Sequence, residues 1–508
     1  MSGEAMGVIA ELERRGIRVK NLCADSRAVG RGDVFVAMPG HRVDGRDYID
    51  AAIANGAAAV LYEPGGKVGT PRALSRKGIC FAAPSGRASG TVMLEVAELA
   101  RFSGDIAHIV YGRPSERLWL AGVTGTNGKT SVSQWIAQAM NAWDCKCAVI
   151  GTLGNGFPPA LAESANTTPD AISLHRALAG YLEQGAVACA MEVSSIGLDQ
   201  GRVNGVNFDV AVFTNLTRDH LEYHGSMEAY GAAKAKLFET AGLGAAVINL
   251  DDSFGRELAA RLRGRVRTIG YTLEDRSGAD EVLAARNFAM TATGIAFDLD
   301  GAHCAAPLVG RFNAANLLAV IGALLAGDEK LADIAAVLPR LRPPPGRMQA
   351  VGGVHEPLVV VDYAHSPDAL EKALATLRET AQARGGRLAC VFGCGGDRDA
   401  GKRPQMGAIA ERLADRAIVT SDNPRSEEPQ AIIAAIIAGM KVLPEIEADR
   451  AAAIASVVRE ADPRDVILLA GKGHEPYQEI AGVRHPFSDL ATAQSALAAR
   501  HAGAGERP

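Results

Sequence analysis

The sequence predicts an α/β protein of three domains, with a central parallel-sheet domain of the P-loop ATPase type and a Rossmann-like C-terminal domain. Three observations lead to this prediction. A glycine-rich turn stands between an apolar strand and an amphipathic segment within residues 120–143. Apolar strands alternate with helical segments over much of the chain, which is typical of a parallel sheet with crossover helices. The run Arg342-Pro-Pro-Pro-Gly346 breaks helices and is the clearest domain boundary.

The composition is that of an ordinary globular protein. The 508 residues are too many for one core, and the hydrophobic and charged shares of 48% and 22% fit a folded chain. No apolar run is long enough to span a bilayer and no signal peptide is evident, so we expect a cytoplasmic protein without a membrane partner. The net charge of −5 gives no reason to expect a nucleic-acid partner. The eight cysteines lack zinc-site spacing and are expected to be reduced thiols.

Residues 1–105 form the first predicted domain. We expect a strand at 33–37, a polar turn at Pro39–Gly45 and a helix at 51–55. The polar turns, among them Asp25-Ser26-Arg27, could hold a ligand. They could equally be turns only, because Asp-Ser and Asp-Gly pairs are common turn formers.

Residues 106–341 form the second predicted domain, with strands expected at 118–123, 187–193, 210–215 and 246–250. The first of these strands runs into Gly122-Val-Thr-Gly-Thr-Asn-Gly-Lys-Thr130. In such a turn small residues let backbone amides surround phosphates, Lys129 neutralises the β and γ oxygens, and Thr130 can hold Mg²⁺. Val123 stands where the strict motif has its first glycine, so the sequence indicates a variant phosphate loop.

Three more side chains of this domain are candidates for metal chemistry. Glu192 ends an apolar strand, where a carboxylate can bind Mg²⁺ together with Thr130 or can instead cap the next turn. His220 follows another strand and could be a second ligand, although a lone histidine is more often structural. Lys234 lies on the apolar stripe of a helix predicted over residues 226–238. Such lysines usually snorkel outward, but a partly buried amine has a lowered pKa and can react with CO₂ to a metal-binding carbamate.

Residues 342–508 form the third predicted domain, in which four apolar strands end in polar clusters. The strands are expected at 358–361, 388–392, 417–420 and 466–470. The clusters are Asp362-Tyr-Ala-His365, Gly393-Cys-Gly-Gly-Asp-Arg398, Ser421-Asp-Asn-Pro-Arg425 and Gly471-Lys-Gly-His-Glu475. Because ligands of open α/β sheets bind outside the carboxyl ends of the strands, we expect the four clusters to converge on one crevice.

Taken together, these motifs resemble the Mur ligase family. The segments that carry the resemblance are Gly122 to Thr130, Asn166-Thr-Thr-Pro169, Glu192-Val-Ser-Ser195, Leu216 to Gly225, Ala233-Lys-x-x-Leu-Phe238, Gly310-Arg-Phe-Asn-x-x-Asn316, Asp362-Tyr-Ala-His365 and Gly471-Lys-Gly-His-Glu475. Within the family, the chain is most similar to members that add the third residue of the peptidoglycan stem peptide. The resemblance implies one domain for the UDP end of the acceptor, one for ATP and one for the incoming amino acid.

The resemblance also implies roles for the matching residues. The ATP contacts are Gly125, Thr126, Asn127, Gly128, Lys129 and Thr130 in the loop, Asn313 and Asn316 at the adenine, and Arg347, Asp362 and His365 in the third domain. The UDP-muramoyl-peptide contacts are Ser26 and the turn at residues 40–45 for the uracil, with Thr167, Thr168, Ser194 and Arg202 for the muramoyl-peptide. The Mg²⁺ ligands are Thr130 and Glu192 for one ion, and His220 and N6-carbamylated Lys234 for a second. The diaminopimelate contacts are Arg398, Asp422, Asn423, Arg425, Gly471 and Glu475, of which Glu475 receives the distal ammonium.

The implied activity is that of an ATP-dependent ligase, expected as a monomer. The D-glutamyl carboxylate of UDP-N-acetylmuramoyl-L-alanyl-D-glutamate attacks the γ-phosphate of ATP, and the amine of meso-diaminopimelate then attacks the acyl-phosphate. Lys129, His220 and Lys234 are the residues expected to carry the catalysis. Two departures from the family pattern, Ile196 in place of a frequent histidine and Ala400 in place of a frequent lysine, affect local contacts but no expected metal or phosphate ligand.

Other readings remain open at this point. A lysine-adding relative would lack an arginine at position 425, whose fork suits the second carboxylate of diaminopimelate. Alternatively, Asn423-Pro424 makes only a turn and Arg425 is a solvated surface residue. A folylpolyglutamate-type ligase would lack the UDP-binding domain, and a scaffold with a vestigial ATP fold has no reason to keep all the expected catalytic residues.

Overall fold

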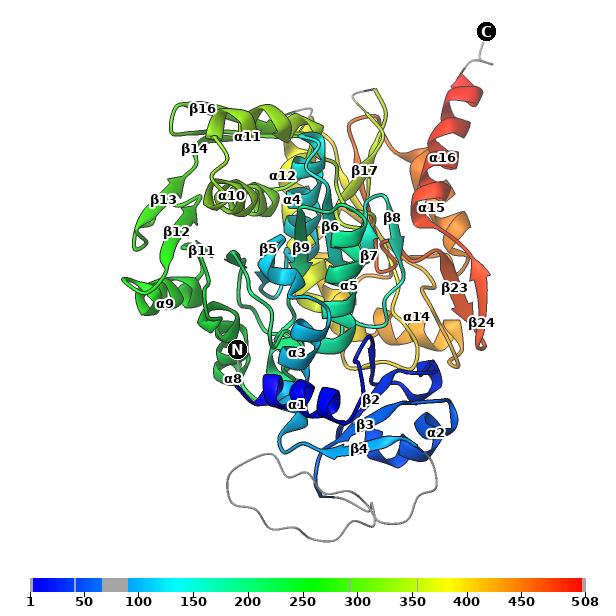
Figure 1. The fold of residues 1–508 in the computed structure, drawn as a ribbon. Coiled ribbons are helices and arrows are strands. Elements are labelled where there is room, and N and C mark those ends of the chain that lie inside the picture. The colour runs from blue at the N-terminus through cyan, green and yellow to red at the C-terminus, as the bar shows by residue number, and fades with distance from the viewer. Residues whose placement is uncertain (1–2, 41–42, 66–89, 292–293, 354, 505–508) are drawn as a thin grey trace. The chain divides into compact units, whose positions relative to one another are not determined.

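The computed structural model describes residues 3–40, 43–65, 90–291, 294–353 and 355–504, and its fold is α/β as predicted (Figure 1). The chain divides into two compact units. Unit 1 comprises Met1–Tyr271, Arg276–Val282 and Ala319–Glu329, and unit 2 comprises Thr272–Asp275, Leu283–Leu318 and Lys330–Pro508. In the described ranges no helix combines the length and the apolar character needed to cross a bilayer.

The first sheet of unit 1 has four parallel strands in the order β1-β2-β3-β4. The elements of this region are α1 (Gly3–Arg14), β1 (Leu22–Cys23), a 3₁₀ helix (Ser26–Ala28), β2 (Val34–Ala37), a 3₁₀ helix (Gly45–Tyr48), α2 (Ile49–Ala54), β3 (Ala59–Tyr62), β4 (Val92–Glu95), α3 (Leu99–Val110) and a 3₁₀ helix (Pro114–Glu116). The strand predicted at 33–37 and the helix predicted at 51–55 are β2 and α2. Residues 41 and 42 of the turn assigned to the uracil lie outside the described residues.

The second sheet has nine strands in the order β13-β12-β11-β10-β5-β9-β6-β7-β8. Its elements and the helices around it are β5 (Trp119–Thr124), α4 (Lys129–Ala142), β6 (Cys147–Gly151), β7 (Gly154–Phe157), β8 (Ala160–Ala162), α5 (Ala171–Glu183), β9 (Ala188–Glu192), α6 (Ser195–Asp199), β10 (Val210–Phe213), α7 (Leu221–His224), α8 (Met227–Ala235) with a 3₁₀ turn (Lys236–Glu239), β11 (Ala245–Asn249), α9 (Ser253–Leu262), β12 (Arg267–Thr272) and β13 (Glu281–Ala284). Helix α10 (Arg311–Ala326) is divided between the two units after Leu318. The four strands predicted for this region are β5, β9, β10 and β11.

The nine-stranded sheet is parallel from β12 to β6, and antiparallel where β6, β7 and β8 pair. The antiparallel edge was not predicted, because β7 holds two glycines and β8 only three residues. β9 is buried at every position and α4 packs on β5, β6 and β9, so these strands are continuous apolar runs. Val123 pairs with Glu192 and Thr124 with Phe213, so three strands end beside the glycine-rich turn.

Unit 2 contains a three-stranded antiparallel sheet (β14-β15-β16), a six-stranded sheet and a two-stranded ribbon (β23-β24). The elements are β14 (Arg286–Thr291), β15 (Gly294–Leu299), β16 (Ala302–Ala306), α11 (Leu331–Val337), a 3₁₀ helix (Leu338–Arg340), β17 (Gln349–Val351), β18 (Leu358–Asp362), α12 (Pro367–Arg384), β19 (Leu388–Phe392), α13 (Lys402–Leu413), β20 (Arg416–Val419), α14 (Pro429–Ile437), β21 (Glu445–Ile446), α15 (Arg450–Glu460), β22 (Val466–Ala470), β23 (Tyr477–Ile480), β24 (Val483–Pro486) and α16 (Asp489–Ala504).

The six-stranded sheet has the order β17-β18-β22-β19-β20-β21 and is parallel except at β17. The four strands predicted for this region are β18, β19, β20 and β22, which are neighbours. Their carboxyl ends therefore lie along one edge, with apolar clusters on both faces of the sheet. Unit 2 also includes the three-stranded sheet, which precedes the proline-rich segment in the chain, so the division into three domains at 105/106 and 341/342 stays a prediction.

Candidate active site

The glycine-rich turn joins β5 to α4 and is held against the end of β10. Gly125 has a φ of +145°, and a Cβ atom there would lie 1.9 Å from Thr214 Oγ1, so only glycine fits. The amide of Thr126 donates to the carbonyl oxygen of Asn215 at 2.8 Å. Gly128 stands at the N-cap of α4, so the positive end of the helix faces the turn. A turn of this geometry can receive phosphate oxygens.

Two lysine side chains meet at the carbonyl oxygen of Gly125. Lys129 Nζ donates to it at 2.9 Å and to the carbonyl of Thr126 at 2.8 Å. Lys234 Nζ donates to the same Gly125 oxygen at 2.8 Å, and its residue is only 1% exposed. Burial, reinforced by the charge of Lys129, lowers the pKa of Lys234 well below its ordinary value. Lys234 therefore does not snorkel outward, and its surroundings favour the neutral amine, the form that reacts with CO₂.

Tyr230 connects the turn with both residues expected to bind the second Mg²⁺. Its hydroxyl lies 3.2 Å from Thr126 Oγ1, and its ring centroid lies 4.4 Å from Lys234 Nζ and 6.2 Å from the ring centroid of His220. His220 has a φ of +52° in the segment between β10 and α7. A non-glycine residue in this conformation is strained, and such strain is frequent at functional sites. Lys234 and His220 thus border one aromatic ring.

Glu192 is a buried carboxylate at the end of β9, 1% exposed. The amide of Thr152 donates to its Oε1 at 2.8 Å, and the Thr152 hydroxyl donates to Oε2 at 3.1 Å. These two donors fix the orientation of the carboxylate. Sequence reasoning missed Thr152, which follows β6 and lies 40 positions from Glu192 in the chain. Ser194 caps α6 by accepting from the amide of Gly197 at 3.0 Å, so Glu192 is not the cap of that helix.

Four residues expected to bind the muramoyl-peptide gather around the end of β9: Thr167, Thr168, Ser194 and Arg202. The Thr167 hydroxyl lies 3.1 Å from that of Thr152, the residue that holds Glu192. Thr168 Oγ1 donates to the main-chain oxygen of Glu192 at 3.0 Å and accepts from the amide of Ser194 at 3.0 Å. Arg202 Nη1 donates to the carbonyl of Thr168 at 2.8 Å. The expected acceptor contacts therefore adjoin the expected Mg²⁺ ligand.

Ser26, the residue expected at the uracil, lies in the region of the first sheet. It is 7% exposed and begins the 3₁₀ helix after β1, with the side chain of Asp25 as its cap. Its carbonyl accepts from Asn55 Nδ2 at 2.8 Å. These contacts hold Ser26 to the end of α2, in a different sheet region from the residues around β9.

The side chains beside the turn fit Mg²⁺ in part. Glu192 and the hydroxyl of Thr130, which is 6% exposed, are hard oxygen donors of the kind that Mg²⁺ prefers. His220 Nε2 lies 3.6 Å from Asp219 Oδ2. Among the described residues, no three His, Cys, Asp or Glu side chains form a metal-binding group by themselves. Mg²⁺ here would draw further ligands from nucleotide phosphates, water or a carbamate on Lys234.

Five residues expected at the nucleotide belong to unit 2: Asn313, Asn316, Arg347, Asp362 and His365. Asn316 Nδ2 donates to Asn313 Oδ1 at 3.1 Å in α10, and both residues are buried. The Arg347 guanidinium lies 5.1 Å from the ring centroid of Tyr363, and in the described part of the chain its buried Nε has no hydrogen-bond partner. Asp362 accepts from the amide of Met348 at 2.8 Å, and burial raises the pKa of its carboxyl although Arg347 opposes this. His365 Nδ1 lies 2.7 Å from the carbonyl of Tyr363.

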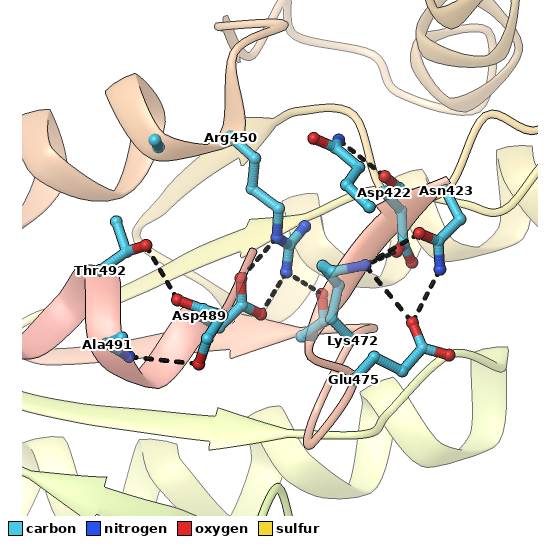
Figure 2. A network of polar contacts seen from close by, with 12 residues as sticks. Asp422, Asn423, Arg450, Lys472, Glu475, Asp489, Ala491 and Thr492 are labelled. Atoms are coloured by element: carbon cyan, nitrogen blue, oxygen red, sulfur yellow. Dashed lines mark hydrogen bonds and ion pairs between the residues drawn. The ribbon is translucent and has the colours of Figure 1, made fainter. Parts of the chain in front are cut away.

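A network of polar groups joins the ends of β20 and β22 (Figure 2). Lys472 is fully buried, donates to Asn423 Oδ1 at 2.9 Å and lies 3.4 Å from Glu475 Oε2 and 3.6 Å from Asp422 Oδ1. Asn423 Nδ2 donates to Glu475 Oε2 at 2.7 Å. A Cβ atom on Gly471, whose φ is +116°, would lie 2.7 Å from Asp422 Oδ2. Four of the six residues expected at diaminopimelate therefore meet, around a lysine that the sequence motif contains but that was not singled out.

Arg425 and Arg398 are the other two residues expected at diaminopimelate. Arg425 has a φ of +51°, its side chain is 23% exposed, and its Nη1 donates to the carbonyl of Gly396 at 2.7 Å. Its Nε lies 3.9 Å from Glu479 Oε2. Arg425 is thus turned toward the loop after β19 and is not a freely solvated side chain. Arg398 is exposed in that loop.

Three family models of the Mur ligases match the chain: the Mur ligase family catalytic domain over residues 18–108, the Mur ligase middle domain over 123–324 and the Mur ligase glutamate ligase domain over 346–473. The chain is similar to proteins named UDP-N-acetylmuramoyl-L-alanyl-D-glutamate--2,6-diaminopimelate ligase. It is 53% identical over 501 residues to that of Chromobacterium violaceum, covering 98% of this chain and 97% of the relative. It is 52% identical over 491 residues to that of Pseudomonas aeruginosa, covering 96% of each. A solved structure of a protein with this name has a TM-score of 0.70 at 38% identity and covers 95% of both chains.

Proposed function

The chain belongs to the Mur ligase family, and we propose that it joins meso-2,6-diaminopimelate to UDP-N-acetylmuramoyl-L-alanyl-D-glutamate, with conversion of ATP to ADP and phosphate, in peptidoglycan precursor synthesis. Relatives that carry this name are more than half identical to the chain over nearly its whole length. The structural observation that most supports the choice of amino acid is the group at the ends of β20 and β22, in which Asp422, Asn423 and Glu475 meet near Arg425.

The turn at residues 125–130 is the proposed phosphate site. Its amides and the N-terminus of α4 suit an anion. Lys129 Nζ donates to two carbonyls of the turn, and its flexible side chain could instead direct the ammonium to a phosphate oxygen. Glu192 and Thr130 would hold Mg²⁺, which supplies positive charge that offsets the repulsion between nucleotide phosphates and the acceptor carboxylate. Asn313, Asn316, Arg347, Asp362 and His365 are the proposed contacts of unit 2 to the nucleotide.

We assign to Lys234 the reaction with CO₂. Its amine is buried and close to the ammonium of Lys129, and both conditions lower its pKa and favour its neutral form. A carbamate would change the side chain from a base to an anion. That anion, together with His220, would provide oxygen and nitrogen ligands for a second Mg²⁺ beside the phosphates.

The reaction proceeds in two steps. The D-glutamyl γ-carboxylate attacks the γ-phosphorus of ATP, ADP leaves, and an acyl-phosphate forms. The amine of diaminopimelate then attacks the acyl carbon, phosphate leaves, and an amide bond forms with loss of a proton. Lys129 stabilises the charge that develops on the transferred phosphoryl group. Thr167, Thr168, Ser194 and Arg202 would orient the acceptor, because they adjoin Glu192.

Diaminopimelate differs from lysine by a carboxylate on the far carbon. Arg425 can bind a carboxylate through two parallel hydrogen bonds, and Glu475 with Asp422 can receive the distal ammonium. Lysine has no carboxylate for the guanidinium, so this charge-assisted pair, worth about 1.5–3 kcal/mol, would not form. These considerations favour diaminopimelate over the lysine-adding alternative. Two findings disfavour a folylpolyglutamate-type ligase. The similar relatives are named diaminopimelate ligases, and residues 18–108 match a Mur ligase family model.

The test is a ligation assay with the purified chain, ATP, Mg²⁺ and the UDP-muramoyl-dipeptide. Phosphate release should require both the dipeptide and an amino acid, and diaminopimelate should be used at a much lower concentration than L-lysine. A parent protein that prefers lysine, or that releases no phosphate with either, would contradict the proposal. Because the proposed reaction consumes ATP and a UDP-linked precursor, we propose that the protein acts in the cytoplasm. We also propose a monomer.

A further inference from the structure

Lys472 is a buried cation to which the proposed reaction gives no role. It lies one residue beyond the turn-forming Gly471 that follows β22, and its neighbours Gly471 and Gly473 both have positive φ, +116° and +53°. Its residue is 0% exposed, and its Nζ also lies 5.8 Å from the ring centroid of Tyr477. An ammonium group at such depth is costly unless carboxylates or strong acceptors surround it. The partners of Lys472 are therefore informative.

Within the described part of the chain, the side-chain amine of Lys472 has three polar partners, and all belong to the proposed amino-acid pocket. Asn423 Oδ1 accepts from Nζ at 2.9 Å, Glu475 Oε2 lies at 3.4 Å, and Asp422 Oδ1 lies at 3.6 Å (Figure 2). Asp422 and Asn423 follow β20, whereas Glu475 follows β22, and β19 lies between these two strands. One ammonium thus connects the two strand ends from which the pocket is built.

Lys472 also determines which way the amide of Asn423 points. A lysine ammonium only donates, so the oxygen of Asn423 and not its nitrogen must face Nζ. The same oxygen accepts from the amide of Glu479 at 2.9 Å. The nitrogen is then directed to Glu475 Oε2, to which it donates at 2.7 Å. Without the ammonium, the orientation of Asn423 and the position of the Glu475 carboxylate would each lose one of their constraints.

The charge of Lys472 matters as well as its hydrogen bonds. Asp422 and Glu475 are two carboxylates that both lie within 3.6 Å of Lys472 Nζ, and the buried guanidinium of Arg450 also interacts electrostatically with both. Loss of the Lys472 charge makes the pocket more negative by one unit, or makes one carboxylate take up a proton. The first change repels the distal carboxylate of diaminopimelate, and the second weakens the grip on its distal ammonium. Lysine, whose end group carries the ammonium alone, suffers less from the first change.

We propose that Lys472 is a positioning residue that holds Asn423 and Glu475 in place and sets the charge of the pocket, so that it receives an end group with both an ammonium and a carboxylate. This inference rests on the proposed function. It assigns to Lys472 no contact with the reacting atoms. It gives the buried lysine a part in the choice between diaminopimelate and lysine.

The experiment compares Lys472→Met and Lys472→Gln with the parent. For Lys472→Met, the KM for diaminopimelate should rise roughly 30-fold or more, as expected when one partner of a buried, hydrogen-bonded charge pair is truncated. The KM values for ATP and for the UDP-muramoyl-dipeptide should change less than about twofold, and the preference for diaminopimelate over L-lysine should shrink. Lys472→Gln keeps a donor for Asn423 but not the charge, so it should recover part of the binding and none of the preference.

The control is Lys372→Met, which removes a lysine of the same unit that pairs with Asp368 on the surface at 2.8 Å; it should behave as the parent. Unchanged KM and preference in Lys472→Met would overturn the proposal. So would an equal loss with both amino acids, or failure of both Lys472 variants to fold, because the lysine would then be structural only. A parent that does not ligate diaminopimelate would instead refute the proposed function, which separates the two failures.

Discussion

Lys234 in unit 1 and Lys472 in unit 2 are equally buried, at 1% and 0% exposure, but their surroundings are opposite. Lys234 donates to a carbonyl oxygen that a second lysine, Lys129, also contacts. Lys472 lies within 3.6 Å of two carboxylates. Burial costs the charged form of either amine, but only the second has carboxylates close enough to repay that cost.

The comparison shows that burial alone does not decide what a lysine can do. The pKa of Lys234 is lowered by burial first and by the charge of Lys129 second, and the charge of Asp219 opposes this as the smallest of the three causes. We therefore propose that its lone pair is available for CO₂. The amine of Lys472 donates a hydrogen bond to Asn423 and lies close to the carboxylates of Glu475 and Asp422. We therefore propose modification for Lys234 and a positioning role for Lys472.

The largest effect is expected from Lys129→Ala. Removal of the charge that faces the β and γ oxygens should lower ATP-dependent phosphate release roughly 10³-fold or more. The same change removes a cation beside Lys234, so the pKa of Lys234 should rise toward its ordinary value. Phosphate release and acyl-phosphate trapping measure the first effect. Lys146→Ala, which removes a surface lysine bonded to the carbonyl of Gln184, is the matched control; comparable phosphate release from both variants would remove the turn from the mechanism.

Lys234→Ala should come next, with ligation reduced about 10²- to 10³-fold, because the variant lacks the carbamate proposed to bind the second Mg²⁺. A short carboxylic acid that fills the vacated space should restore part of the activity. With ¹³C-labelled bicarbonate, the parent should give a carbamate signal in its NMR spectrum. The signal should vanish in Lys234→Ala and persist in Lys472→Met. Loss of the carbamate signal in Lys472→Met, or full activity of Lys234→Ala, would contradict the roles proposed for the two lysines.

The sequence predicted the strands that carry these sites better than it predicted what holds the side chains. β5, β9, β18, β19 and β22 are buried on both faces, and continuous apolar runs followed by polar clusters are easily recognised. Some of the strands that were missed are glycine-rich or half exposed, such as β7 and β15, and give no clear pattern. Others, such as β6 and β12, are almost entirely buried and were missed all the same.

The missed site residues have a common property. Thr152 acts on Glu192 across 40 positions, and Lys472 acts on Asn423 across 49. Both pairs depend on strand order, since β9 pairs with β6 and β19 stands between β20 and β22. The sequence places such residues at strand ends, but strand order is what makes them neighbours. The proposed ATP contacts of unit 2 were predicted from the family resemblance alone.

Arg425→Ala should produce a smaller and more selective loss. If the guanidinium binds the distal carboxylate, the KM for diaminopimelate should rise about 30- to 100-fold, corresponding to about 2–3 kcal/mol for a charge-assisted hydrogen-bonded pair. The rate with L-lysine should change little, because lysine has no carboxylate there. Competition between the two amino acids in one assay measures the preference directly. If the preference of Arg425→Ala for diaminopimelate over L-lysine were unchanged, Arg425 would not be the residue that distinguishes the two substrates.

The smallest effect is expected from Tyr230→Phe, which tests how Lys234 is held in place. The ring that lies 4.4 Å from Lys234 Nζ remains, and only the contact of the hydroxyl with Thr126 Oγ1 is lost. Loss of one neutral hydrogen bond costs about 1 kcal/mol, so kcat should fall less than about tenfold while the carbamate signal persists. Tyr230→Ala removes the ring and should lower both kcat and the carbamate signal.

Tyr271→Phe is the control for these Tyr230 variants, because Tyr271 is equally buried and its hydroxyl donates to the carbonyl of Phe213 at 3.1 Å and not to the turn. This variant should lose thermal stability and keep kcat. If Tyr230→Phe and Tyr271→Phe both changed only the melting temperature, the hydroxyl of Tyr230 would be a packing contact. In that case the neutral amine of Lys234 would depend on burial and Lys129 alone, without help from the turn at Thr126.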